Sequence, residues 1–190
     1  IPLIHPEWIR QDLPRLKNWL FISSIRSADH IITISEHSKH DLIAHLGLLP
    51  EQISVTPLGV EPCYFDRIDQ QQIDATLRKH DLQPGFFLFV GTLQPRKNLR
   101  GLLKAFGQLP TAIRKQHKLV VVGRDGWGNE DLLPELQALE ARGEGYWLDY
   151  LPKQQVMALL QSAAALVFPS LYEGFGLPVI EAFAARCPVI

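Results

Sequence analysis

The chain has 190 residues, 46% of them hydrophobic, which is enough for one or two domains with a sizeable core. It carries 19 basic and 20 acidic residues, a net charge of −1, which argues against a general nucleic-acid-binding protein. Cys63 and Cys187 lack C-x-x-C spacing, so we interpret them as reduced thiols of a cytosolic protein. No apolar run reaches the ~18 residues that span a bilayer.

The start and the end of the sequence indicate a piece of a longer protein. The chain begins at Ile1 without a methionine or a signal peptide, and it ends at Ile190, where the pattern of a new strand begins. We therefore expect a fragment.

The first part of the chain predicts a short α/β unit. An apolar helical pattern lies within residues 1–28, and a β run follows at 31–34. Ser35 is expected to cap a helix of about 36–46, and a second strand is expected at 53–56. Residues 1–60 therefore have the strand–helix–strand order of a Rossmann-like α/β unit, and the family resemblance given below implies that this unit is the last part of an N-terminal domain.

The pattern loosens between residues 61 and 84, where one polar helix at 69–80 is expected, and we interpret this segment as an interdomain connection. A second domain, 85–190, follows. Its apolar strands are expected at 86–90, 118–122, 145–149 and 164–168. Helices are expected at about 98–109, 130–142, 153–162 and 177–185. This alternation predicts a doubly wound parallel sheet with helices on both faces.

Ligands of such sheets bind beyond the carboxyl ends of the strands, where this sequence gathers glycines, charges and aromatic residues. Arg96 and Lys97 follow the strand at 86–90 and suit a diphosphate, whose negative charge grows as it leaves. The alternative is a solvated basic pair. Positive charge at a helix start is unfavourable, which favours a functional role.

A glycine-rich loop, Gly123 to Gly128, follows the next strand, but it has neither dinucleotide-binding nor P-loop spacing. Gly123 permits close approach of a ligand, although this signal is weak by itself. Three histidines, His37, His40 and His45, share one predicted helix without metal-site spacing, so we predict no metal.

Two carboxylates, Glu173 and Glu181, flank a loop with two glycines at the start of the last helix, which Pro178 can begin. A glycosidase acid/base pair is one interpretation. A surface-loop position for Glu173 and a favourable first-turn charge for Glu181 are the structural alternatives. Because backbone N–H groups at this helix start favour anions, we prefer carboxylates that bind sugar hydroxyls beside a phosphate site.

These segments resemble retaining GT-B glycosyltransferases of family 4. Glu173-Gly-Phe-Gly-Leu-Pro-Val-Ile-Glu181 matches the family's E-x₇-E motif, and Gly91-Thr-Leu-Gln-Pro-Arg96-Lys97-Asn98 resembles its diphosphate-binding segment. Residues 28–36 and 55–60 resemble the end of the family's N-terminal domain and the crossing into the second.

The resemblance implies a role for each matching position. Arg96 and Lys97 would hold the diphosphate as leaving group, Glu173 would bind the transferred sugar, and Glu181 would bind the ribose. The remaining donor-binding positions would border the phosphates, the sugar or the base: Gly91, Thr92, Gly123, Leu148, Asp149, Tyr150, Gly174, Phe175, Gly176 and Leu177. Asp149 stands where relatives commonly have glycine, which puts the base pocket in doubt.

The resemblance also implies the reaction: transfer of a hexose with retention and without a metal or other cofactor. GDP-mannose is favoured over a UDP-hexose as donor substrate, and a saccharide or polyprenyl-diphosphate-linked glycan as acceptor. This would serve cell-surface polysaccharide synthesis, such as O-antigen, in the bacterial cytoplasm. Membrane contact would use the part of the N-terminal domain missing here, and the fragment alone is expected to be inactive. A nucleotide-sugar epimerase and a non-catalytic sugar- or nucleotide-binding module are the alternatives.

Overall fold

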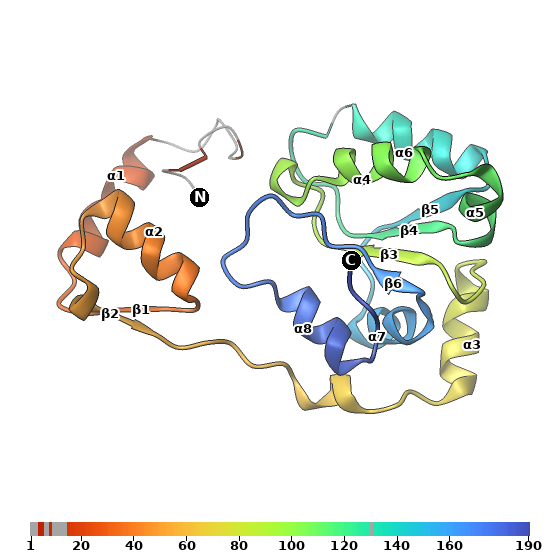
Figure 1. Ribbon diagram of the computed structural model, residues 1–190, viewed down its shortest axis with the longest axis horizontal. Helices are drawn as coiled ribbons and strands as arrows, with labels where there is room; N and C mark the ends of the chain where they lie inside the picture. The colour runs from red at the N-terminus through yellow and green to blue at the C-terminus, as the bar shows by residue number, and fades with distance from the viewer. Residues whose placement is uncertain (1–3, 6–7, 9–14, 130) are drawn as a thin grey trace. The chain divides into compact units, whose positions relative to one another are not determined.

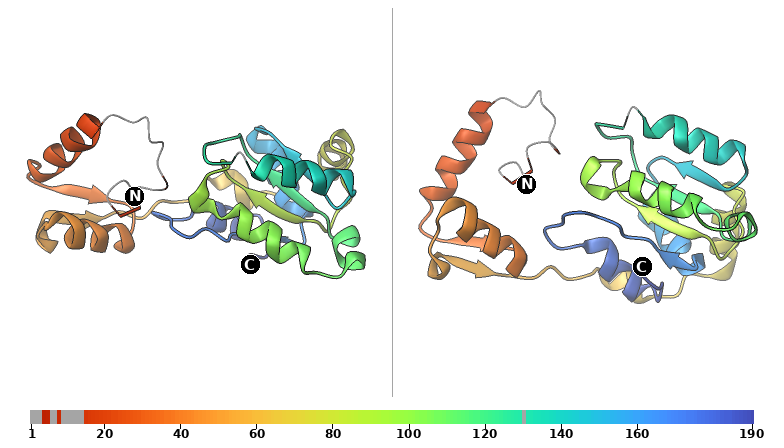
Figure 2. Two further views of the ribbon diagram at one scale, coloured as in Figure 1. Left: turned by 90° about the horizontal axis from the view of Figure 1, so that it is seen from above. Right: turned by 45° about the horizontal axis from the view of Figure 1, so that its top comes forward.

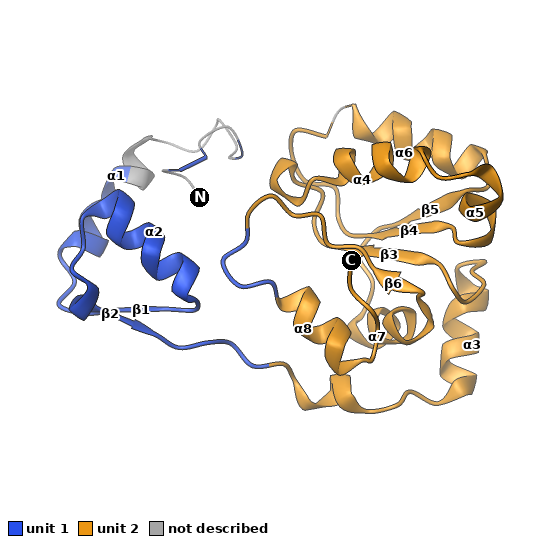
Figure 3. Ribbon diagram, in the orientation of Figure 1, with its two compact units in different colours: residues 1–59, 173–176 blue, residues 60–172, 177–190 orange. Residues whose placement is uncertain are grey.

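The computed structural model describes residues 4–5, 8, 15–129 and 131–190, and the chain divides into two compact units (Figure 3). Unit 1 consists of Ile1–Gly59 and Glu173–Gly176, and unit 2 consists of Val60–Tyr172 and Leu177–Ile190. The expected helical pattern before Arg15 lies outside the described residues.

Unit 1 is built around two parallel strands. Its elements in order are α1 (Arg15–Arg26), β1 (Ile31–Thr33), α2 (Glu36–Leu46), the 3-10 helix η2 (Pro50–Gln52) and β2 (Ile53–Val55). Strand β1 pairs with β2 in parallel, and Ile53 is buried between the helices and the strands.

The ends of α2 follow directly from two residues. The Ser35 hydroxyl accepts a hydrogen bond from the backbone N–H of Ser38, which confirms the predicted cap. Gly47 ends the helix at a φ of 68°, and its N–H donates to the carbonyl of Ile43.

Unit 2 contains a four-stranded parallel sheet in the order β5-β4-β3-β6 (Figure 1). The strands are β3 (Phe87–Val90), β4 (Leu119–Val122), β5 (Gly145–Leu148) and β6 (Ala165–Leu166). Beyond β6, Val189 forms an isolated parallel bridge with Leu166. The doubly wound parallel sheet expected from the sequence is therefore confirmed.

Helices cover both faces of this sheet, as two views of the unit show (Figures 1 and 2). On one face, α4 (Leu99–Gly107) and α6 (Leu132–Ala141) pack against the apolar side chains of β3 and β4. On the other lie α3 (Gln70–Lys79), α7 (Lys153–Ser162) and α8 (Leu177–Ala184). All four residues of β4 are buried, because this strand is covered on both faces.

Residues 61–84, which we expected to connect two domains, lie within unit 2. The 3-10 helix η3 (Pro62–Phe65) packs against α8, and α3 packs against α7. Tyr64 and Leu77 are buried in the same core as the sheet. The sequence shows a helix here, but its polar composition did not reveal that one side of it joins the core.

Four short elements were not expected: the 3-10 helices η2 and η3, the 3-10 helix η4 (Pro95–Lys97), and α5 (Thr111–Gln116), which follows Pro110. Strand β6 is also shorter than the predicted strand at 164–168. Its ladder nevertheless continues, because the N–H of Val167 donates to the carbonyl of Leu88 and the N–H of Phe168 to that of Ile190.

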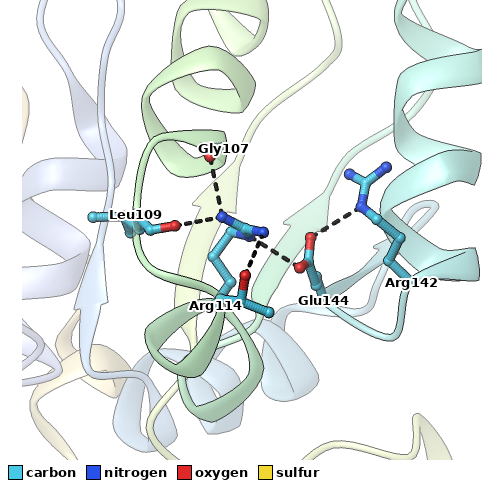
Figure 4. A network of polar contacts seen from close by, with 6 residues as sticks. Gly107, Leu109, Arg114, Arg142 and Glu144 are labelled. Carbon is cyan, nitrogen blue, oxygen red and sulfur yellow. Dashed lines mark hydrogen bonds and ion pairs between the residues drawn. The ribbon is translucent and has the colours of Figure 1, made fainter.

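A buried ion-pair network stands at the amino end of β5 (Figure 4). The Glu144 side chain is 4% exposed, and its two oxygens accept from Arg114 Nε and Arg142 Nε, each at 3.0 Å. Arg114 also donates to the carbonyls of Gly107, at 3.1 Å, and Leu109. Hydrogen bonding from Arg142 and then Arg114 holds the pKa of Glu144 below its ordinary value, despite burial.

Candidate nucleotide-binding site

The sheet of unit 2 has a switch point between β3 and β6. The chain leaves β3 toward α4 on one face, and it leaves β6 toward α8 on the other. In open α/β sheets, ligands bind in the crevice at such a point, beyond the carboxyl ends of the strands. The loops 91–98 and 167–172 therefore carry the candidate site.

Three hydrogen bonds tie these two loops together. The N–H of Leu171 donates to the carbonyl of Arg96 at 2.8 Å, and Arg96 Nη1 donates to the carbonyl of Tyr172 at 3.3 Å. Asn98 Nδ2 donates to the carbonyl of Pro169 at 3.1 Å. The loop that bears the cations is thus fixed to the loop that leads into Glu173.

Lys97 is 7% exposed, which is uncommon for a lysine, and its ammonium nitrogen lies 5.1 Å from the centroid of the Phe168 ring. A Cβ built on Gly91 would lie 3.5 Å from Lys97 Cε, so the lysine stem crosses this glycine. A buried cation at a switch point is suited to an anionic group of a ligand.

Arg96 is the more accessible of the two cations. Its Nε donates to Gln94 Oε1 at 3.1 Å, which fixes the plane of the guanidinium group. Thr92, exposed, follows Gly91 in the same loop. The structure therefore places Gly91, Thr92, Arg96 and Lys97 in the one loop that follows β3, and the Lys97 side chain lies against Gly91.

Gly123 serves a purpose that the sequence did not reveal. A Cβ at this position would lie 2.0 Å from the carbonyl oxygen of Gly91, so no other residue fits. The N–H groups of Gly91 and Gly123 extend the sheet ladder to Val122 and Leu148, respectively. The contact between these neighbouring loops is thus sufficient to require a glycine at position 123.

A cavity of about 500 Å³ opens at the carboxyl ends of β4 and β5, lined by Arg124, Asp125, Trp147 and Asp149. The guanidinium carbon of Arg124 lies 4.7 Å from the centroid of the Tyr150 ring. Trp147 Nε1 donates to the carbonyl of Gly123 at 3.0 Å, which fixes the indole. This cavity contains Asp149 and adjoins Tyr150, two of the residues predicted at the base.

Three of these residues, Arg124, Asp125 and Trp147, were missed as site residues. The available signal was the polar segment directly after the strand at 118–122, because strand ends of a parallel sheet meet at one edge. Leu148, which was predicted to border the donor, is partly buried and packs against the core of the sheet.

Glu181 lies on α8, and its carboxylate accepts a hydrogen bond from the hydroxyl of Tyr64. Burial raises the pKa of Glu181, and the Tyr64 hydrogen bond opposes that rise. Burial, together with the charge and hydrogen bond of Glu181, raises the pKa of Tyr64 as well. Leu177, the first residue of α8, is exposed.

Glu173, Gly174, Phe175 and Gly176 belong to unit 1 (Figure 3). The carbonyl of Gly174 accepts a hydrogen bond from the hydroxyl of Ser35 in that unit. Chain connectivity places these four residues between Tyr172 and Leu177, so they continue the loop that leaves β6.

Within the part of the chain that the structure describes, no group of three or more histidine, cysteine or acidic residues could hold a metal ion. No helix among the described residues is long and apolar enough to cross a membrane.

Fold and site together define a doubly wound α/β domain that carries two cations at its switch point and a cavity at the ends of β4 and β5. The model of group 1 glycosyl transferases matches residues 70–190, and the model of glycosyltransferase family 4 matches residues 3–63. The chain belongs to the group 1 glycosyltransferase family.

Several curated proteins and solved structures are similar to the chain. O-antigen chain mannosyltransferase B of Escherichia coli is 35% identical over 97% of this chain and 49% of its own length. The serotype-specific mannosyltransferase WbdA of Escherichia coli is 29% identical over 100% of the chain and 24% of its own length. The chain thus spans about half or less of these relatives.

Among solved structures, Anabaena Alr3699/HepE in complex with UDP and glucose matches with a TM-score of 0.77 at 20% identity, over 98% of this chain and 50% of its own. WaaG, a glycosyltransferase involved in lipopolysaccharide biosynthesis, matches with a TM-score of 0.73 at 20% identity, over 98% of this chain and 53% of its own. These similarities establish the GT-B fold.

Proposed function

We propose that this chain forms the donor-binding part of a glycosyltransferase that transfers mannose from a nucleotide-sugar to a saccharide or polyprenyl-diphosphate-linked acceptor, with retention and without a bound metal. The observation that carries the proposal is the buried Lys97 beside Arg96 at the switch point of the sheet. Similarity to O-antigen mannosyltransferases supports mannose as the sugar.

The catalytic requirement is to stabilise a diphosphate as it leaves the sugar. Two preorganised cations do this without a metal, since their positions are set before the reaction by the two loops and by Phe168. Glu173 would hold the hydroxyls of the transferred sugar, and Glu181 those of the ribose. The backbone from Gly174 to Leu177 would face the phosphates and the sugar at the helix start.

The nucleoside would extend along the edge of the sheet from this point. Neighbouring strands lie about 4.8 Å apart, so the cavity at β4 and β5 is within reach of a nucleoside diphosphate whose phosphates lie at β3 and β6. The reaction would take place in the cytoplasm, at the inner face of the membrane that carries a lipid-linked acceptor.

The test is donor screening on the full-length protein with a polyprenyl-diphosphate oligosaccharide acceptor, using GDP-mannose and UDP-hexoses with and without EDTA. We expect an α-linked mannoside from GDP-mannose, formed equally with EDTA present and identified by NMR of the product. An inverted linkage, or loss of activity with EDTA, would overturn the mechanism. Epimer or free sugar released without acceptor would instead support an epimerase or hydrolase.

A further inference from the structure

We infer that the cavity at the carboxyl ends of β4 and β5 selects guanine, through the carboxylate of Asp149 and the guanidinium group of Arg124. The inference rests on the proposed function, because it assigns the nucleobase of the same donor. It derives from the chemistry of the four lining residues, Arg124, Asp125, Trp147 and Asp149.

The two carboxylates that line the cavity differ in their hydrogen bonds. Asp125 Oδ1 accepts from Nδ2 of Asn129, a residue only 3% exposed, so a buried amide holds Asp125 in place. Asp149 makes no hydrogen bond or ion pair with another described residue, and it is an exposed residue of the cavity lining. Both oxygens of Asp149 are therefore available to a ligand.

The guanidinium group of Arg124 makes a cation–π contact with the ring of Tyr150. The Arg124 guanidinium carbon lies 4.7 Å from the Tyr150 ring centroid, and Arg124 lines the cavity together with Asp149. Trp147, fixed by its hydrogen bond to Gly123, supplies an apolar surface on which a planar base can stack. The cavity thus offers the Trp147 ring for stacking, two carboxylate oxygens of Asp149 as hydrogen-bond acceptors, and the guanidinium N–H groups of Arg124 as donors.

Guanine matches this set of groups on one edge. Its N1–H and N2–H₂ are adjacent donors that suit the two oxygens of a carboxylate, and its O6 is an acceptor for a guanidinium group. Uracil presents a single N–H between two carbonyl oxygens, so one of its acceptors would face the Asp149 carboxylate. Adenine and cytosine would each place a ring-nitrogen lone pair there. Each of these bases would thus place an acceptor against the Asp149 carboxylate, which disfavours its binding relative to guanine.

The test compares GDP, IDP and UDP by isothermal titration with the full-length protein and its Asp149→Ala variant. IDP lacks only the N2 amino group that the carboxylate would accept. We expect the wild type to bind GDP roughly 10- to 100-fold more tightly than IDP, as for a hydrogen bond to a charged group, and UDP more weakly still. In Asp149→Ala the preference for GDP over IDP should fall to about one.

Asp131→Asn is the matched control, because it removes one negative charge from an exposed side chain that pairs with Arg100 at 3.3 Å. It should keep the wild-type preference. Equal binding of GDP and IDP by the wild type, or an unchanged preference in Asp149→Ala, would overturn the guanine assignment and leave the diphosphate site intact. Absence of binding by all three nucleotides would overturn the proposed donor site as well.

Discussion

The Lys97 ammonium nitrogen lies 5.1 Å from the centroid of the Phe168 ring, so a cation that follows β3 rests on an aromatic side chain that follows β6. The two residues are 71 positions apart in the sequence, yet they meet because β3 and β6 are neighbours in the sheet. The ring restricts the lysine to the switch point, where we propose that the diphosphate binds.

Replacing Phe168 tests this relationship. Because a cation–π contact contributes about 0.5–2 kcal/mol, Phe168→Leu should lower kcat/KM for the donor by roughly twofold to thirtyfold. Phe168→Tyr keeps an aromatic face and should remain near the wild type. Steady-state transfer rates at several donor concentrations measure both variants, and equal kcat/KM values for the leucine and tyrosine variants would contradict a role for the ring.

Removing the cation itself should have a larger effect. Lys97→Ala should lower kcat by roughly 10²- to 10³-fold, the loss typical of one electrostatic group that stabilises developing charge. Glu173→Ala should lower turnover by a similar factor if this carboxylate holds the transferred sugar. Lys104→Ala, an exposed lysine on α4, is the control and should transfer at the wild-type rate. Near-wild-type transfer by both test variants would exclude these residues from the site.

Asn98 combines a left-handed backbone, a helix cap and a link between loops. Its φ is 54°, its Oδ1 accepts from the N–H of Gly101 at 3.2 Å, and its Nδ2 donates to Pro169. Asn98→Ala should lower the free energy of unfolding by about 2 kcal/mol, from the lost cap and the strained backbone. Asn98→Gly relieves the strain and should cost less. Urea denaturation measures both, and a glycine variant less stable than the alanine variant would contradict this account.

The Glu144 network predicts a pH dependence of stability. Because hydrogen bonds from Arg142 and Arg114 lower the pKa of Glu144 in the folded state, the folded protein releases this proton more readily than the unfolded chain. The resulting stability is complete above the unfolded pKa of about 4.3 and is lost as the pH falls through the folded value.

Glu144→Gln removes that dependence, so its free energy of unfolding should fall less steeply below pH 4.5 than that of the wild type. Glu144→Ala should cost roughly 3 kcal/mol at pH 7, since it leaves the largely buried Arg114 without its charged partner. Glu135→Gln, half-exposed and 4.0 Å from Arg100, should change little. If the free energy of unfolding fell equally steeply with acid in the wild type and in Glu144→Gln, the ion pairs of Glu144 would not contribute to stability.

Burial raises the pKa of Glu181, so its carboxylate takes up a proton at a higher pH than an ordinary glutamate. If the charged form binds the ribose hydroxyls, GDP affinity should weaken as the pH falls through this raised pKa. Tyr64→Phe removes a hydrogen bond that lowers the pKa and should move the transition to higher pH. Titrations with GDP from pH 4 to 8 measure this, and Glu181→Gln should show no such transition.

Local patterns in the sequence were sufficient for most of the secondary structure. The period of apolar residues, the Ser35 cap and the glycines after strands depend on near neighbours in the chain, so helix α7 and the strands β3, β4 and β5 could be predicted to within a residue or two. The parallel sheet followed from their alternation. The sequence also placed Arg96, Lys97, Glu173 and Glu181 in loops or at a helix start beyond strand ends.

Only the tertiary structure decided which of these loops meet. The order β5-β4-β3-β6 brings Phe168 to Lys97 and carries Arg124 and Asp149 to one cavity, contacts that no local pattern contains. It also assigns a different reason to Gly123, whose missing side chain makes room for the Gly91 carbonyl. Burial of one side of α3 likewise depends on its packing against α7. A hydrogen bond between His80, at the end of α3, and Gln155 on α7 joins residues that are 75 positions apart in the sequence, so this packing is a property of the fold.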